Sequence, residues 1–172
     1  MYLRTVLLGI AALAMYAMRA NNIQVSGTTL VENTGSTVKI QFDVSWENSW
    51  RGGPVANWDA AWLFAKCKLS NGLWQHVRLA SSGHTTPTGT SMDLGLIDPA
   101  GAYNAATNPV VGAFLYRNAN GYGTLDASGV QLFWDHAAQG VLSLVDVVEL
   151  RVFAMEMVYV NGGPYYLGTG SG

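Results

Sequence analysis

The chain has 172 residues, of which 12% are charged and 49% are hydrophobic, and its formal net charge is −2. This composition predicts a chain that folds around a single hydrophobic core, and it argues against a disordered protein. Lys and Arg form no cluster along the chain, so a nucleic acid would find no basic surface to pair with. We therefore expect no nucleic-acid partner.

The first residues have the pattern of a secretory signal peptide. Arg4 precedes an apolar run over residues 5–17, as in the basic and hydrophobic regions of such signals. Cleavage after Ala20 would leave residues 21–160 as the mature domain. The alternative is that residues 1–20 are retained as a hydrophobic helix buried in an assembly. We expect an exported protein, at the cell surface or outside the cell, that meets a membrane only through this segment during export.

The rest of the chain consists of short apolar runs separated by turn residues. Residues 38–46 alternate strictly between apolar and polar side chains, which predicts a strand with one buried face. Residues 60–67 are almost continuously apolar and predict a central strand, and Asn71-Gly72 predicts the hairpin turn that follows it. Further strands are predicted over residues 23–25, 73–79, 92–96, 110–117, 124–133 and 145–160. The fold class predicted is all-β, an antiparallel two-sheet β-sandwich preceded by the hydrophobic N-terminal segment.

Residues able to support catalysis or metal binding are few and scattered. Cys67 is the only cysteine, which excludes an intrachain disulfide, and its position in a strand predicts a small core residue. The histidines, His76, His84 and His136, lack the spacing of metal ligands. Asp135 next to His136 lacks a nucleophile motif to complete a catalytic set.

One carboxylate pair could in principle share a strand face. Asp43 and Glu47 lie four residues apart, but glycoside hydrolysis needs two opposed acids at a defined separation. Both residues fit the solvent side of a half-buried strand more simply. We therefore predict no catalytic residue, no metal and no cofactor, and we predict that the chain is not an enzyme.

The chain contains six tryptophans. Trp46 and Trp62 fall within predicted strands and are predicted to lie in the core. Trp50 and Trp58 flank a Gly-Gly-Pro turn and are predicted to be more exposed. Indole faces stack on sugar rings or anchor protein interfaces, so Trp50, Trp58 and Trp74 are the candidate ligand-binding residues.

Four segments suggest a family. They are residues 21–26 (NNIQVS), 41–51 (QFDVSWENSWR), 57–62 (NWDAAW) and 129–134 (GVQLFW). These segments resemble the N-terminal companion region of exported bacterial proteins that carry a formylglycine-generating-enzyme-like (sulfatase-modifying-factor) domain.

This likeness extends over residues 21–160, and residues 155–168 are similar to the opening segment of the enzyme-like domain itself. The resemblance implies a companion domain without the catalytic domain, followed by a tail over residues 161–172. The catalytic cysteines and copper ion of that family lie beyond this opening segment, so no catalytic residue is carried over.

These patterns favour a non-catalytic structural or adhesive subunit that self-associates into a cell-surface or extracellular assembly such as a filament. Strands with unpaired edges associate by edge pairing or strand donation, and residues 145–160 are the strand expected to pair between chains. The partner would be a second copy or another surface protein. One alternative is a carbohydrate-binding module that binds a polysaccharide through exposed tryptophans. A further alternative is an accessory domain of a formylglycine-generating-enzyme-like protein.

Overall fold

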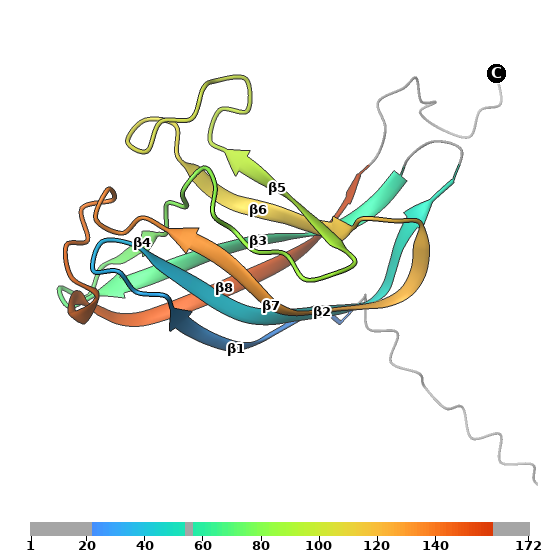
Figure 1. The fold of residues 1–172 in the computed structure, drawn as a ribbon, viewed down its shortest axis with the longest axis horizontal. Coiled ribbons are helices and arrows are strands. Elements are labelled where there is room, and N and C mark those ends of the chain that lie inside the picture. Colours follow the sequence, from blue (N-terminus) through green and yellow to red (C-terminus); the bar gives the residue numbers. More distant parts are fainter. Residues whose placement is uncertain (1–21, 54–56, 160–172) are drawn as a thin grey trace, which may run out of the picture.

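The computed structural model describes residues 22–53 and 57–159, and these residues form an all-β fold (Figure 1). The strands are β1 (Gln24–Val31), β2 (Val38–Gly52), β3 (Asn57–Leu69), β4 (Trp74–His76), β5 (Thr90–Leu96), β6 (Val110–Arg117), β7 (Gly121–Trp134) and β8 (Val147–Tyr159), with a short 3-10 helix, η1 (Leu144–Asp146), before β8. All strand pairs among them are antiparallel and belong to one connected sheet, which confirms the predicted all-β antiparallel class. The predicted signal segment and C-terminal tail lie outside the described residues.

The pairing divides the sheet into two groups of strands. In the first group β2 lies between β1 and β7. In the second group β3 lies between β8 and β6, β5 extends the sheet beyond β6, and β4 pairs with the end of β3. The groups are joined by pairing between the end of β2 and the start of β3, with Arg51 opposite Trp58 and Gly52 opposite Asn57. The prediction that residues 60–67 form a central strand is therefore confirmed.

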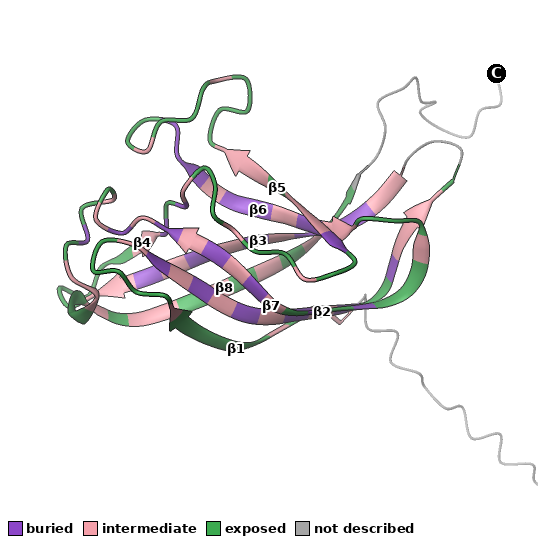
Figure 2. Ribbon diagram, in the orientation of Figure 1, coloured by how far each residue is buried: buried purple, intermediate pink, exposed green. Residues whose placement is uncertain are grey.

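The hydrophobic core joins the two groups. The five alternate apolar residues of β2 that the sequence predicted to face inward are Val38, Ile40, Phe42, Val44 and Trp46, and each is at most 1% exposed. They form one buried cluster with inward residues of β3, β6 and β7. Figure 2 shows buried positions alternating with less buried ones along β2 and β7. Cys67 belongs to this cluster, and burial raises the pKa of its thiol, as expected for a core residue.

The prediction that Trp62 lies in the core is wrong. The buried residues of β3 that face inward are Ala61, Leu63, Ala65 and Cys67, so Trp62 projects from the opposite side of the strand, where it is half-buried. The apolar run over residues 60–67 has no polar side to reveal which residues face inward. The register of β3, which the sequence does not give, decides the position of Trp62.

A buried carboxylate of β3 links the two groups through hydrogen bonds to β2. Asp59 is 0% exposed, and its oxygens accept hydrogen bonds from the Trp46 indole N–H at 2.5 Å, the Ser49 hydroxyl at 3.0 Å and the Trp50 backbone N–H at 2.9 Å. Ser49 Oγ in turn accepts a hydrogen bond from Arg117 Nε on β6 at 3.0 Å. A buried charge needs such partners to remain favourable. This network fixes the ends of β2, β3 and β6 relative to each other.

Two strand boundaries differ from the sequence prediction. β2 continues to Gly52 rather than ending near residue 46, because a bulge at Asn48, with φ 57°, interrupts the alternation without ending the strand. β8 begins at Val147 instead of residue 145, since η1 precedes it. Among the described helical residues, which are those of η1, there is no segment long and apolar enough to cross a membrane.

Candidate functional site: an aromatic face and an open strand edge

Aromatic and methionine side chains gather on the outward side of the second strand group. Residues directly opposite each other in antiparallel strands share one side of the sheet. Trp62 lies opposite both Phe114 and Met155, and Phe64 lies opposite Phe153. We call this surface the aromatic face, and its members are Trp58, Trp62, Phe64, Phe114, Tyr116, Phe153, Met155 and Met157.

The rings of this face pack closely on one another. The ring centroids of Trp62 and Phe114 are 4.6 Å apart, and those of Phe64 and Phe153 are 5.0 Å apart in a stacked arrangement. The Trp62 indole lies against Gly95 and Gly112, where a Cβ atom on either glycine would overlap the ring. The two glycines therefore allow this large ring to lie close to the sheet.

The side chains of β8 leave this face open to solvent. Phe153 is 36% exposed, Met155 is 49% exposed and Met157 is 46% exposed. Contiguous exposed apolar surface of this kind is uncommon on a monomer, and it marks surfaces that bind something. The aromatic face is therefore a candidate interaction surface.

At one end of the aromatic face lies a groove of about 350 Å³, which we call the Trp58 groove. Its lining residues are Trp58, Ala60, Asp93, Phe114, Tyr116, Met157 and Val158. The Trp58 and Tyr116 ring centroids are 5.8 Å apart, and the Arg51 guanidinium lies 5.2 Å and 5.6 Å from them. Arg51 Nη1 also donates a hydrogen bond to the Arg117 carbonyl oxygen, which holds the guanidinium beside the two rings.

A hydrogen bond separates this groove from a second one. The Tyr116 hydroxyl donates to Asp93 Oδ2 at 2.8 Å. Burial raises the pKa of Tyr116, and the hydrogen bond to Asp93 and the negative charge of Asp93 raise it further. The positive charge of Arg51 has the opposite, smaller effect. The Tyr116 hydroxyl therefore stays protonated and acts as the hydrogen-bond donor. On the other side lies a groove of about 400 Å³, which we call the Ser91 groove. It is lined by His84, Thr86, Thr90, Ser91, Met92, Asp93, Leu94 and Tyr116.

The sequence did not single out Asp93 and Tyr116. They belong to neighbouring strands, and the register places Asp93 directly opposite Phe114, which makes Tyr116 its diagonal neighbour. The polar residues Ser91 and Asp93 alternate with apolar residues in β5, and this alternation indicates that one side of the strand is exposed. Without the register, that signal could not identify the partner strand.

The three predicted ligand-binding tryptophans do not form one platform. Trp58 lies in the groove beside Tyr116. Trp50 is half-buried on β2, opposite Tyr122 of β7. Trp74 is 40% exposed on β4 opposite Lys68, with the Arg151 guanidinium 5.1 Å from its ring. Lys68 is ten residues from Trp58 on the same strand, a separation of about 33 Å at about 3.3 Å per residue.

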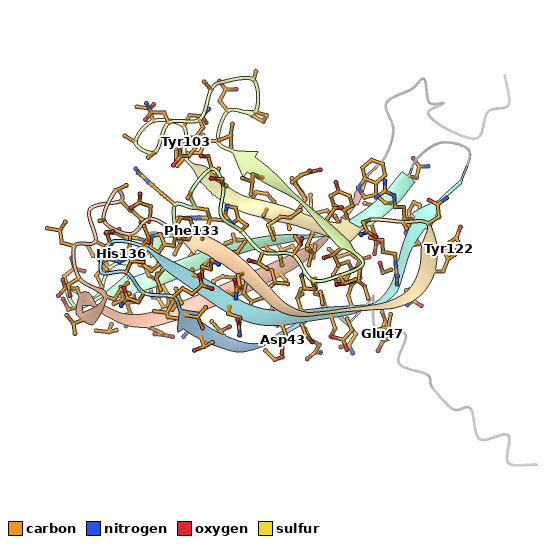
Figure 3. The ribbon with its side chains drawn as sticks, in the orientation of Figure 1. Asp43, Glu47, Tyr103, Tyr122, Phe133 and His136 are labelled. Carbon is orange, nitrogen blue, oxygen red and sulfur yellow. The ribbon has the colours of Figure 1, made fainter. Side chains whose placement is uncertain are left out.

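The carboxylates considered for catalysis each have a separate local partner. Asp43 Oδ1 accepts a hydrogen bond from the Gly129 backbone N–H at 2.8 Å, and Glu47 Oε1 accepts one from Asn22 Nδ2 at 3.2 Å. Figure 3 places both side chains along the same margin of the molecule. These contacts hold β2 to β7 and to the segment that precedes β1.

The histidines lie apart, and His136 has an unusual environment. Its Nδ1 lies 2.6 Å from the Val141 carbonyl oxygen, while Nε2 is buried and has no partner among the described residues. His76 stacks on Phe64, and His84 lies in the loop between β4 and β5. Nowhere in the described ranges do three His, Cys, Asp or Glu side chains come together in a way that could hold a metal ion.

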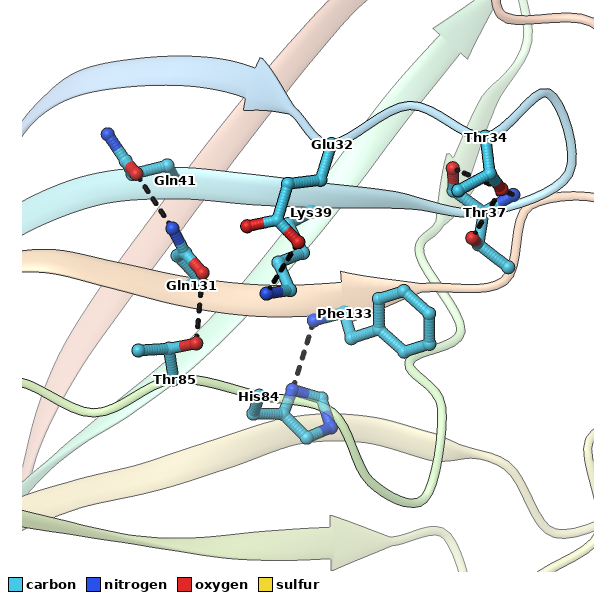
Figure 4. Close-up of polar contacts among 9 residues, drawn as sticks. All are labelled: Glu32, Thr34, Thr37, Lys39, Gln41, His84, Thr85, Gln131 and Phe133. Carbon is cyan, nitrogen blue, oxygen red and sulfur yellow. Dashed lines mark hydrogen bonds and ion pairs between the residues drawn. The ribbon is translucent and has the colours of Figure 1, made fainter.

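The free edge of β7 is covered at residues 131–134 by the loop that follows β4. Thr85 and Gln131 exchange two backbone hydrogen bonds, and the Ala80 N–H donates to the Phe133 carbonyl oxygen at 3.0 Å. Between these contacts the Phe133 N–H donates to Nδ1 of the His84 side chain at 3.1 Å (Figure 4). The His84 ring thus occupies the place of a backbone acceptor.

Within the described ranges, β8 forms backbone hydrogen bonds with β3 alone, and β1 lies near β8 without pairing with it. β8 pairs with β3 from Val147 to Tyr159, and no other described strand pairs with it. In an antiparallel edge strand, about half of the backbone N–H and C=O groups point away from the sheet. A strand of 13 residues therefore offers a long row of unpaired groups.

Comparison of the chain with family models, curated proteins and solved structures found no match.

Proposed function

We propose that the chain is a non-catalytic structural or adhesive subunit that self-associates outside the cell, with the edge of β8 pairing with a strand of a second copy. The observation that carries this proposal is the open edge of β8, 13 residues long, beside the exposed apolar side chains of the aromatic face. Pairing would satisfy the outward backbone groups and remove Phe153, Met155 and Met157 from water. A β-sandwich of two packed sheets, preceded by the exported N-terminal segment, is the architecture proposed for the subunit.

β8 is better suited to pairing than the other open edges. The β1 edge is interrupted by a register shift between Ser26 and Thr29, with Gly27 at φ 63°. β5 has only seven residues. Bulges and short length are features that discourage edge pairing. The single register shift in the β8–β3 ladder lies at the start of β8, where Val148 is the extra residue, and β8 pairs regularly from Glu149 to Tyr159.

The charges on β8 are compatible with close approach of a second strand. Arg151 forms an ion pair with Glu149 two residues away on the same side of the strand. Isolated charges on an edge strand oppose pairing, whereas a pair within the strand leaves little net charge in that part of the edge. Phe153, Met155 and Met157 on the same side are apolar, and the third charged residue of β8, Glu156, lies on the other side of the strand, opposite Ala61.

The test compares the size of wild-type and variant particles by sedimentation velocity and negative-stain electron microscopy. Phe153→Lys places a charge on the aromatic face of β8, and Val152→Pro removes a donor from the strand. We expect wild-type protein to form particles larger than a monomer, and both variants to be monomers that remain folded by circular dichroism. Tyr122→Lys is the matched control, because Tyr122 is 77% exposed on β7 and its substitution should leave the particles unchanged. Monomeric wild-type protein, or unchanged particles in both β8 variants, would refute the proposal.

A second candidate is a carbohydrate-binding module, favoured by Trp58, which lines an open groove next to Tyr116 and a carboxylate. Aromatic rings beside polar groups bind the apolar and hydroxylated sides of a sugar ring. Retention of the monomeric Phe153→Lys variant on insoluble polysaccharides tests this function without interference from assembly. Loss of all retention in that variant, with its fold intact, would exclude it.

The likeness to the companion region of formylglycine-generating-enzyme-like proteins supports a third role, that of an accessory domain. Residues 161–172, which are similar to the beginning of the enzyme-like domain, lie outside the described residues. The intact mass of the native gene product tests this role. A product that continues into an enzyme-like domain would support it, and one that ends at Gly172 would argue against it.

A further inference from the structure

The Trp58 groove and the Ser91 groove are neighbours with contrasting linings. The first is bordered by Trp58, Phe114 and Met157, whereas the second is bordered by hydroxyl-bearing side chains such as Ser91 and Thr86. Asp93 and Tyr116 line both of them. A ligand that crosses the Asp93–Tyr116 hydrogen bond would therefore meet an apolar surface on one side and a polar surface on the other.

The charges around this boundary favour a neutral ligand. The Arg51 guanidinium already occupies a cation–π position close to both Trp58 and Tyr116, so a second cation would meet its repulsion. An anion would meet the carboxylate of Asp93, which is exposed. The Asp93 carboxylate and the hydroxyl groups of the Ser91 groove are instead suited to hydrogen bonds with ligand hydroxyls.

The carboxylate of Asp93 has free capacity to accept hydrogen bonds. Its Oδ2 atom accepts from Tyr116, while no hydrogen bond to Oδ1 is found among the described residues. A carboxylate has about four acceptor positions, so Oδ1 and the remaining lone pair of Oδ2 can accept from two adjacent hydroxyls. The Tyr116 bond fixes the orientation of the group before any ligand arrives.

We infer that the two grooves together form a binding site for a neutral glycan of at least two pyranose units. One unit lays its C–H face on Trp58 and the neighbouring rings of the Trp58 groove, and its hydroxyls donate to Asp93. The next unit lies in the Ser91 groove, among the hydroxyls of Ser91 and Thr86. This inference rests on the second candidate function and is independent of assembly through β8.

The test is affinity electrophoresis of the Phe153→Lys variant through gels that contain neutral polysaccharides: mixed-linkage β-glucan, xyloglucan, galactomannan, xylan or starch. Isothermal titration with the hexasaccharide of the strongest retarding polymer, and with the matching monosaccharide, then gives affinities. We expect at least one polymer to retard the protein, and the hexasaccharide to bind at least tenfold more tightly than the monosaccharide. Trp58→Ala and Asp93→Asn, each added to the same background, should weaken hexasaccharide binding at least tenfold.

Trp74→Ala on the same background is the matched control, because Trp74 is exposed near the aromatic face but lies outside both grooves. It should bind the hexasaccharide as the parent does. Retardation that survives both Trp58→Ala and Asp93→Asn in folded protein would overturn the assignment of the site while leaving the carbohydrate-binding function in place. The absence of retardation by every polymer would overturn both.

Discussion

The two outermost long strands, β7 and β8, differ in whether their free edges have backbone hydrogen-bond partners. The end of β7, residues 131–134, is covered by the loop over residues 79–85, which supplies backbone partners and one side-chain acceptor, His84 Nδ1. β8 pairs with β3 alone within the described ranges. Edge closure thus depends on particular contacts and is not a general property of the sheet. The contrast also explains why assembly is proposed through β8 and not through β7.

The largest change in stability and association should come from a substitution at Gly83 that displaces the covering loop from the β7 edge. This residue has φ 89°, and a Cβ atom there would lie 2.9 Å from Phe133 Cδ1. Gly83→Val should lower the free energy of unfolding by about 2 kcal/mol through backbone strain and displacement of Phe133. It should also cause the monomeric Phe153→Lys variant to associate, measured by sedimentation velocity.

Gly72→Val is the control for backbone strain alone, since Gly72 has φ 83° but no neighbour within 4 Å of the added Cβ. It should destabilise the protein in urea melts without causing association. Equal association of both glycine variants would show that the loop does not protect the β7 edge.

A smaller effect is expected when the side-chain acceptor at the β7 edge is removed. His84→Ala leaves the Phe133 N–H without its acceptor and should lower the free energy of unfolding by about 1 kcal/mol. His84→Asn places an amide oxygen near the position of Nδ1 and should recover part of the loss. If urea denaturation gives the same stability for His84→Ala as for wild type, the His84 contact does not hold the loop.

The same contact should make stability depend on pH. Nδ1 of His84 accepts a hydrogen bond, which requires a neutral ring. Burial lowers the pKa of His84, and the hydrogen bond to the Ala80 carbonyl oxygen partly opposes this effect. The unfolded chain therefore takes up the proton first as the pH falls. The contribution of His84 is complete above about pH 6.5 and is lost as the pH falls from there through the lower folded pKa. His84→Asn should remove this part of the pH dependence in urea melts, and an identical profile in wild type and variant would contradict the assignment.

The smallest effect is expected at the exposed end of the covering loop. Thr85 Oγ1 donates to Gln131 Oε1 at 2.9 Å, and Gln131 Nε2 donates to Gln41 Oε1 at 2.8 Å. Thr85→Val removes the first of these bonds, which is exposed to solvent, and should cost about 0.5 kcal/mol in the free energy of unfolding. A loss greater than about 1.5 kcal/mol would mean that the Thr85–Gln131 contact matters more to the edge than the His84 contact.

Sequence patterns predicted the strands well where one face is polar. The alternation over residues 38–46 identified the buried face of β2, and the apolar run over residues 60–67 correctly indicated a central strand. The same run misplaced Trp62, because both faces of β3 are apolar and only the register separates them. The continuation of β2 past the bulge at Asn48 was missed for a related reason, since a bulge breaks the alternation that marks a strand.

The candidate sites were predicted only in part. The long last strand and Trp58 were identified from composition, whereas the Asp93–Tyr116 pair and the His84 contact depend on which strands and loops become neighbours. Residues 81–89 have the composition of an ordinary polar loop. Nothing in that composition indicates that one of its side chains replaces a backbone acceptor.

Amide hydrogen exchange of assembled wild-type protein, compared with the Phe153→Lys variant, tests the role of β8 most directly. The account predicts that amides of residues 147–159 exchange more slowly in wild-type particles than in the variant, while those of β7, residues 121–134, exchange alike in both. Equal exchange of β8 in the two proteins, or selective protection of β7 in the wild type, would contradict pairing through the β8 edge.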